Sequence, residues 1–138
     1  MVVPVKIIGI DHVVFRVADV ERSLDFYLGT LGLEPVRVDE WRAGTVLFPS
    51  ARVDAHTIID IFPRELAGDD GTADATVARN VDHVCLVVEP CDLQAVADSG
   101  NFDVVGGPAD LFGARGQGIG LYVRDPDGNV VELRHYGS

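Results

Sequence analysis

The sequence predicts an α+β fold made of two similar βαβββ modules. Its 138 residues are 47% hydrophobic and 24% charged, which is typical of a single globular domain with one core. The segments 10–17 and 81–88 are identical at four of eight positions, so the chain contains an internal repeat. Each copy begins with a segment of strand composition and continues with a helical pattern.

The repeat continues through both halves of the chain at nearly constant spacing. His83 lies 83 − 12 = 71 positions after His12, and Glu132 lies 132 − 60 = 72 positions after Asp60. Asp60 and Glu132 each stand at the centre of an apolar strand segment. We therefore predict one domain over residues 1–138, made of a first module at 6–63, an exposed linker at 64–80 and a second module at 81–138.

The first module is expected to begin with a strand over residues 6–17, which are rich in β-branched and aromatic side chains. Asp19 is expected to cap a helix that ends at Gly32, because apolar residues recur between them at helical spacing. Three short strands follow in the prediction, near residues 35–39, 44–48 and 56–62, with turns at 49–50 and 54–55.

The second module repeats this plan after the acidic linker. A strand is expected at 81–88, a shorter helix after Pro90, and a strand around 102–105. The segment Asp125-Pro126-Asp127-Gly128 has the composition of a type I turn, so it predicts a closing hairpin between residues 118–124 and 129–136. The glycine-rich run 113–120 is interpreted as a mobile flap, since it lacks the spacing of a dinucleotide-binding loop.

Composition excludes several classes of partner. Lysine and arginine number 11 and aspartate and glutamate 22, which gives a formal charge of 11 − 22 = −11 and disfavours nucleic acids and anionic membranes. The longest apolar run, 84–88, is far below the ~18 residues of a membrane-spanning helix. Cys85 and Cys91 fit neither a disulfide framework nor a zinc motif, so we interpret both as packing residues and expect a cytoplasmic protein.

Four polar residues at repeated strand positions predict a metal site. Strand alternation places His12, His83 and Glu132 on the faces opposite those packed under the helices, and Asp60 shares this pattern. If the two modules form one curved sheet, these faces line a common hollow. Packing alone would favour valine or isoleucine there, because an unpaired buried carboxylate is unfavourable. Two imidazoles and a carboxylate suit Fe(II), Mn, Ni or Zn, with positions left open for a substrate.

Two further residues of the first module are candidates for proton transfer. Asp60 is either a fourth ligand, an acceptor for a ligand, or a general base, because its side chain is shorter than that of glutamate. His56 lies four positions before Asp60 on the same strand face and could orient a carboxylate or transfer a proton. The alternative for His56 is an exposed histidine at the start of a strand.

These motifs resemble the vicinal oxygen chelate superfamily. The resemblance rests on Ile10-Asp11-His12-Val13-Val14, on Val20-Glu21-Arg22-Ser23-Leu24-Asp25-Phe26-Tyr27, on Val81-Asp82-His83-Val84 and on the closing segment 125–133. It covers nearly the whole chain. It implies a U-shaped, mostly antiparallel eight-stranded sheet around a metal-binding cavity, a homodimer, and a divalent metal on His12, His83 and Glu132 that chelates two adjacent oxygens of a small-molecule substrate.

The branch of this superfamily is less well specified by the motifs. The segment from Leu121 to Glu132 resembles the end of the extradiol dioxygenase signature, in which a tyrosine at the position of Tyr122 hydrogen-bonds the substrate. That signature also has a histidine shortly before the tyrosine, where this chain has Gly113-Ala114-Arg115-Gly116. Tyr122 is therefore either a catalytic residue or an ordinary strand aromatic.

The leading hypothesis is a metal-dependent enzyme that acts on a small molecule with vicinal oxygens. The expected chemistry is a glyoxalase-like lyase or isomerase reaction with Asp60 as the base, or dioxygenase chemistry if the metal is Fe(II). The alternatives are a drug-binding protein of the bleomycin-resistance type, which would lack the ligand set, and a thiol transferase of the fosfomycin type.

Overall fold

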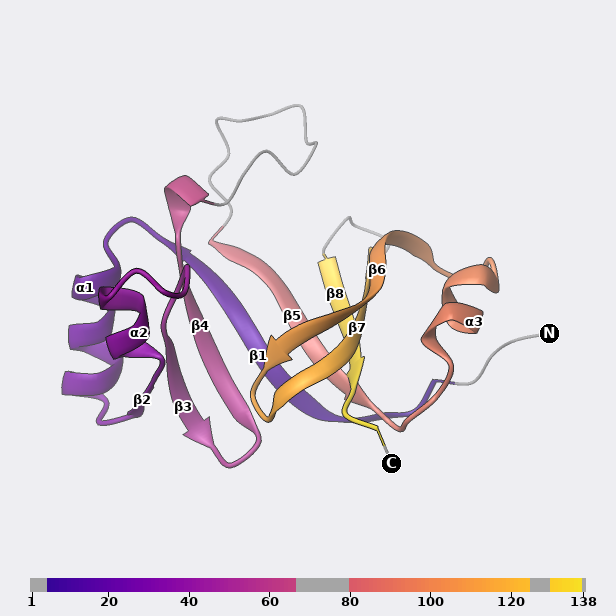
Figure 1. Ribbon diagram of the computed structural model, residues 1–138, viewed down its shortest axis with the longest axis horizontal. Coiled ribbons are helices and arrows are strands. Elements are labelled where there is room, and N and C mark those ends of the chain that lie inside the picture. The colour runs from indigo at the N-terminus through magenta and orange to yellow at the C-terminus, as the bar shows by residue number, and fades with distance from the viewer. Residues whose placement is uncertain (1–4, 67–79, 125–129, 138) are drawn as a thin grey trace. The chain divides into compact units, whose positions relative to one another are not determined.

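The computed structural model describes residues 5–66, 80–124 and 130–137, which form one mixed sheet with short helices (Figure 1). Its strand order is β2-β3-β4-β1-β5-β8-β7-β6, so two edge strands remain and the sheet is not closed. The strands are β1 Ile7–Val17, β2 Glu34–Val36, β3 Ser50–Asp54, β4 Thr57–Pro63, β5 Val81–Val88, β6 Asp103–Gly113, β7 Gly116–Arg124 and β8 Val130–His135. The predicted α+β class with eight strands in two βαβββ halves is confirmed.

The chain divides into two compact units whose limits differ from those of the predicted modules. Unit 1 comprises Met1–His12, Ala55–Thr57 and His83–Ser138, and unit 2 comprises Val13–Asp54 and Ile58–Asp82. The first half of β1 therefore belongs to the same unit as β6, β7 and β8.

Unit 2 contains the predicted first helix, although its second half is a π-helix. The α-helix α1 spans Val20–Leu24, and its cap is Asp19, whose carboxylate accepts a hydrogen bond from the Arg22 backbone N–H at 3.1 Å. The π-helix η1, Asp25–Thr30, continues directly from α1. The left-handed residue Gly32, with φ of 73°, follows its end, as predicted from the glycine.

One strand predicted in the first module is wrong. Residues 44–48 form no strand, and the helix α2, Val38–Arg42, precedes them. Val38 is buried in a cluster with Val20, Leu24 and Ile61, and this packing selects a helical turn over the expected extended segment. The strand next to β2 is instead β3, which pairs with β2 antiparallel and runs between the turns predicted at 49–50 and 54–55.

Unit 1 contains the core that supports the candidate site. Strand β5 pairs in parallel with β8, and β8 pairs antiparallel with β7. The helix α3, Leu93–Asp98, is capped by Asp92 and packs its buried residues against these strands. One cluster of buried core residues in this unit comprises Val88, Leu93, Val96, Leu121, Val123 and Leu133.

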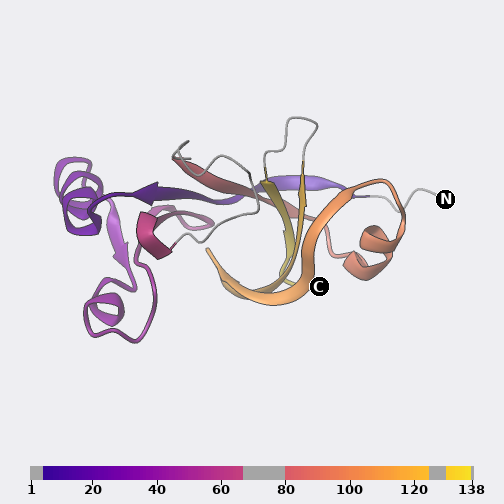
Figure 2. The same ribbon diagram turned by 90° about the horizontal axis from the view of Figure 1, so that it is seen from above.

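The glycine-rich run interpreted as a flap is part of the antiparallel hairpin of β6 and β7. Strands β6 and β7 pair antiparallel up to a turn between Gly113 and Gly116, and β6 is strongly curved (Figure 2). The expected turn at residues 125–128 lies outside the described residues. The strands on either side of it pair as predicted, with Arg124 opposite Val130.

Among the described residues, no helix is both long and apolar enough to span a membrane. The described helices are the three short α-helices, the π-helix η1 and the 3-10 helix η2 at Arg64–Leu66. The rest of the predicted linker, residues 67–79, lies outside the described residues.

Candidate metal centre

The structure brings the three predicted metal ligands together within unit 1. His12 lies on β1, His83 on β5 and Glu132 on β8, which are three neighbouring strands. The Nε2 atoms of the two histidines are 3.2 Å apart, and Glu132 Oε1 lies 3.4 Å from Nε2 of His12 and 3.2 Å from Nε2 of His83. Potential ligand atoms of all three residues therefore fall within 4.8 Å of one another, so together they could hold a metal ion.

Asp11 determines which nitrogen of His12 faces this cluster. The Nδ1 atom of His12 lies 2.7 Å from Oδ1 of Asp11, and both residues are buried. Burial raises the pKa of Asp11, but its bonds to His12, Tyr136 and the Ala114 backbone lower it more, so the net pKa lies below the usual value. Oδ1 of Asp11 accepts from Nδ1 of His12, so Nδ1 carries a proton and Nε2 is the ring atom that faces Glu132 and His83.

Arg134 holds one oxygen of Glu132 and leaves the other facing the histidines. Its Nε atom donates to Glu132 Oε2 at 2.8 Å, and its Nη atoms donate to the carbonyls of Leu111 and Phe112 at 2.8 and 3.0 Å. Both side chains are fully buried. Burial raises the pKa of Glu132, but His12, His83 and Arg134 together lower it well below its ordinary value. Glu132 is therefore a carboxylate.

The environment of the second Glu132 oxygen, Oε1, indicates that a cation fits between it and the two histidines. Oε1 is buried and makes no hydrogen bond among the described residues, although two imidazole nitrogens lie within 3.4 Å. A buried acceptor without a donor is unfavourable, and Nε2 of His12 faces the same place. A divalent cation would satisfy these atoms together, and two nitrogens with one carboxylate oxygen suit Fe(II), Mn, Ni or Zn.

Gly113 and Gly120 make room for the buried side chains of Arg134 and Glu132, because a glycine has no Cβ atom to collide with them. A Cβ atom added at Gly120 would lie 2.8 Å from Glu132 Oε2, and one at Gly113 would lie 2.6 Å from Arg134 Nη1. Any larger residue would therefore displace the groups that orient Glu132. The glycine-rich run has a packing role beneath the centre, which its spacing in the sequence alone does not reveal.

Tyr122 lies beside two of the three candidate ligands, His83 and Glu132. It stands opposite Glu132 in the pairing of β7 and β8, and its ring meets that of His83 edge to face at 5.3 Å between centroids. Burial and the neighbouring Glu132 both raise the pKa of Tyr122 above its ordinary value. The hydroxyl therefore stays protonated at neutral pH and can donate a hydrogen bond.

Asp60 and His56 lie outside the ligand clusters found among the described residues. Asp60 belongs to unit 2, where it is buried on β4 and accepts a hydrogen bond from Ser50 Oγ at 2.5 Å. Its charge acts on Arg37, where burial lowers the pKa of the guanidinium and Asp60 raises it. His56 is exposed in the turn between β3 and β4. The catalytic roles of both residues remain predictions.

Sequence reasoning did not identify the side chains that support the ligands. Asp11 accepts a hydrogen bond from Tyr136, and Arg134 donates to Glu132, with its guanidinium 5.5 Å from the centroid of the Tyr136 ring. Asp11, His12 and Cys85 are a second group with ligand atoms within 4.8 Å. The Asp-His pair repeated in both modules was the available signal for Asp11. Arg134 gives no such signal, since its burial depends on the space left by distant glycines.

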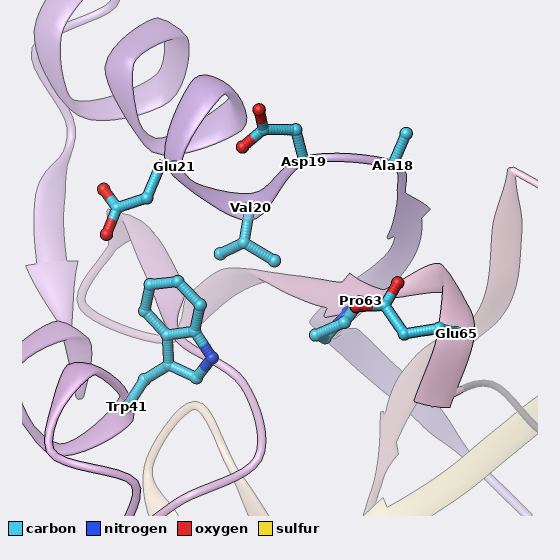
Figure 3. A pocket seen from close by; sticks show the side chains of 7 residues that line it. All are labelled: Ala18, Asp19, Val20, Glu21, Trp41, Pro63 and Glu65. Atoms are coloured by element: carbon cyan, nitrogen blue, oxygen red, sulfur yellow. The ribbon is translucent and has the colours of Figure 1, made fainter.

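A separate surface pocket of about 460 Å³ lies in unit 2 (Figure 3). The indole of Trp41 lies near Val20, and the carboxylates at the rim come from three acidic residues. Glu21 forms an ion pair with Arg42 at 2.8 Å. The lining residues are Ala18, Asp19, Val20, Glu21, Trp41, Pro63 and Glu65, and none of the predicted site residues is among them.

Comparison with known families identifies the class of protein. The family model described as the Glyoxalase/Bleomycin resistance protein/Dioxygenase superfamily matches residues 9–133, which include the three candidate ligands. The chain belongs to this superfamily.

Individual relatives agree with this assignment. The chain is 30% identical over 131 residues to the glyoxalase domain-containing protein RDO1 of Mycosarcoma maydis, covering 93% of this chain and 68% of that protein. It is 27% identical over 130 residues to the virulence protein STM3117 of Salmonella typhimurium, covering 92% and 83%. It is 29% identical over 128 residues to a probable lactoylglutathione lyase of Synechocystis, covering 88% and 91%.

Solved structures confirm the fold. The Mn(II)-bound glyoxalase from Novosphingobium aromaticivorans superimposes with a TM-score of 0.67 at 21% identity, over 97% of this chain and 41% of that chain. A methylmalonyl-CoA epimerase in complex with methylmalonyl-CoA and NH4+ superimposes with a TM-score of 0.63 at 19% identity, over 96% and 97%. The predicted fold class of this superfamily is therefore the observed one.

Proposed function

We propose that this chain is a divalent-metal-dependent enzyme that acts on a small molecule with vicinal oxygens. The observation that carries the proposal is the convergence of His12 Nε2, His83 Nε2 and Glu132 Oε1, with Oε1 buried and lacking a hydrogen bond. Fe(II), Mn, Ni and Zn all accept this ligand set.

Among the reactions of this superfamily, we propose a glyoxalase-like lyase or isomerase reaction. The similarity to the probable lactoylglutathione lyase over 88% of this chain supports this choice. A second candidate, Fe(II)-dependent dioxygenase chemistry, is favoured by the position of Tyr122 against His83. It is weakened by the β6–β7 turn, where Ala114 and Arg115 stand in the place of the expected histidine.

Each residue has a distinct proposed task. When bound, the metal ion would act as a Lewis acid toward two adjacent substrate oxygens. His12, His83 and Glu132 would hold it, while the Tyr122 hydroxyl would donate a hydrogen bond to a substrate oxygen. Asp60 would be the base that removes a proton from the substrate, and His56 would assist proton transfer.

Metal analysis of protein purified without a histidine tag tests the proposal. We expect about one divalent ion per chain after reconstitution, and a higher melting temperature, because a ligand that binds only the folded state stabilises it by about 2.7 kcal/mol at 100 times its Kd. His83→Ala should abolish both effects. A wild-type chain that binds no metal after reconstitution would favour a drug-binding protein instead.

Activity variants then separate the assigned roles. Tyr122→Phe should lower turnover of the active substrate in a screen of 2-oxoaldehyde hemithioacetals, with metal content unchanged. Asp60→Asn should abolish turnover if Asp60 is the base, also with metal retained. Loss of metal in Asp60→Asn would make Asp60 a fourth ligand rather than the base.

We also propose that the protein is a cytoplasmic homodimer. Ile8 and Ile10, which lie on the same face of β1, are each about half exposed, and a second chain could cover them. The acidic composition and the two free cysteines agree with an intracellular location without nucleic-acid or membrane partners. Sedimentation equilibrium tests the dimer, and a monomer at micromolar concentration would refute it.

A further inference from the structure

Asp11 and its repeat counterpart Asp82 have different environments. Asp11 is fully buried, whereas Asp82 is half-buried and forms an ion pair with Arg16 at 2.6 Å. Repetition alone would not bury a carboxylate, because its desolvation is unfavourable unless donors compensate for it. The burial of Asp11 therefore requires donors that compensate for the desolvation of its carboxylate.

Three donors from three separate segments converge on Asp11. Its Oδ1 accepts from His12 Nδ1 at 2.7 Å and from the Ala114 backbone N–H at 2.8 Å, and its Oδ2 accepts from the hydroxyl of Tyr136. Ala114 lies at the turn between β6 and β7, and Tyr136 follows β8. The backbone donor on Oδ1 fixes the plane of the carboxylate independently of the histidine.

The orientation of His12 follows from this carboxylate. Because Oδ1 accepts at Nδ1, the ring must present Nε2 to Glu132 Oε1 and to His83 Nε2, which lie 3.4 and 3.2 Å away. A carboxylate on the far nitrogen fixes the tautomer of a metal-binding histidine and makes the ligand nitrogen more basic. Removal of such a partner typically weakens metal binding by about 10–100-fold.

We propose that Asp11 is a positioning residue that fixes His12 in its Nδ1–H tautomer and so presets Nε2 as a ligand atom before any metal binds. This inference rests on the proposed metal-dependent function. It adds to it a residue that contacts neither metal nor substrate. The competing explanation is that Asp11 has only a structural role, in which its hydrogen bonds hold the β6–β7 turn and Tyr136 against β1.

Asp11→Asn separates the two explanations because it keeps the geometry. An amide oxygen at the Oδ1 position can still accept from His12 and Ala114, and its NH2 group can donate to the hydroxyl oxygen of Tyr136. The variant loses mainly the negative charge. Tyr136→Phe instead removes the hydrogen bond from Tyr136 to Asp11 and leaves the Asp11–His12 contact in place. Asp110→Asn, at an exposed position of β6, matches the change in net charge.

The test combines a ring spectrum without metal and Mn(II) titration with metal. In the metal-free wild type, 15N-detected NMR should show His12 protonated at Nδ1, with a strongly downfield proton that moves upfield in Asp11→Asn but not in Asp110→Asn. The Kd for Mn(II) should rise at least about 10-fold in Asp11→Asn. It should stay within about threefold in Tyr136→Phe and Asp110→Asn.

Several results would overturn the proposal. Protonation of His12 at Nε2 in the metal-free wild type would do so. Equal weakening of Mn(II) binding by Tyr136→Phe and Asp11→Asn would also do so, because it would show that Asp11 has only a structural role. If the wild type binds no Mn(II), the proposed function fails. The assignment of Asp11 is then decided by the ring spectrum, and an unchanged His12 proton in Asp11→Asn would refute it.

Discussion

The Nε2 atoms of His12 and His83 lie 3.2 Å apart, although 71 positions separate the two residues in the sequence. The internal repeat explains this contact, because equivalent positions of β1 and β5 come together when these two strands are neighbours in the sheet. Glu132 enters the same place from β8, on the other side of β5. The repeat thus supplies one histidine from each half of the chain, and Glu132 adds a third ligand atom that comes from the second half alone.

Gly120→Ala should weaken metal binding without unfolding the protein. The added Cβ atom would lie 2.8 Å from Glu132 Oε2 and 3.1 Å from Leu111 Cδ1, so the carboxylate must move. We expect the Kd for Mn(II) to rise by about 10-fold, as for other changes that misorient a ligand. Gly106→Ala is the control, since a Cβ there has open space. Equal affinities of the two variants would show that the close packing at Gly120 does not orient Glu132.

Arg134→Met should destabilise the fold strongly. The substitution removes the ion pair between Arg134 and the buried carboxylate of Glu132, together with the hydrogen bonds that Arg134 donates to the carbonyls of Leu111 and Phe112. Breaking a buried pair in this way typically costs about 3–5 kcal/mol. Urea denaturation measures the loss, with Arg42→Met in the exposed pair with Glu21 as the control. Similar midpoints for the two variants would mean that the buried pair adds nothing specific.

The two cysteines should differ in their reactivity toward a thiol reagent. Cys85 is fully buried, and burial raises the pKa of its thiol to about 12, although contact with His12 lowers it in part. Cys91 is half-buried, and burial also raises the pKa of its thiol. Thiolate is the reactive form, so the native protein at pH 8 should show one slowly reacting thiol, which Cys91→Ser removes. Rapid labelling of two thiols without denaturant would contradict the buried position of Cys85.

The sequence predicted most of the fold through local signals. Asp19 at the start of the first helix and Gly32 beyond its end were both identified, because capping depends on residues close in the chain. The segment 38–48 was assigned wrongly. Its only helix has five residues and gains its stability from the packing of Val38 against distant residues, which local propensity does not report.

The candidate site was predicted to the extent that it follows the repeat. His12, His83 and Glu132 were identified because strand alternation and a constant offset place them together. Asp11 and Arg134 were missed as supporting residues, since a buried polar side chain depends on donors and space from distant segments. Those segments include the turn at Ala114 and the glycines of the β6–β7 hairpin.

The most direct test of the central claim is pulsed EPR of the protein loaded with one equivalent of Mn(II). We expect nitrogen couplings from two imidazole ligands, His12 and His83. One coupling should remain in His12→Ala and one in His83→Ala, whereas His56→Ala should keep both. A Mn(II) spectrum without imidazole coupling, or couplings that survive the loss of both His12 and His83, would contradict the account.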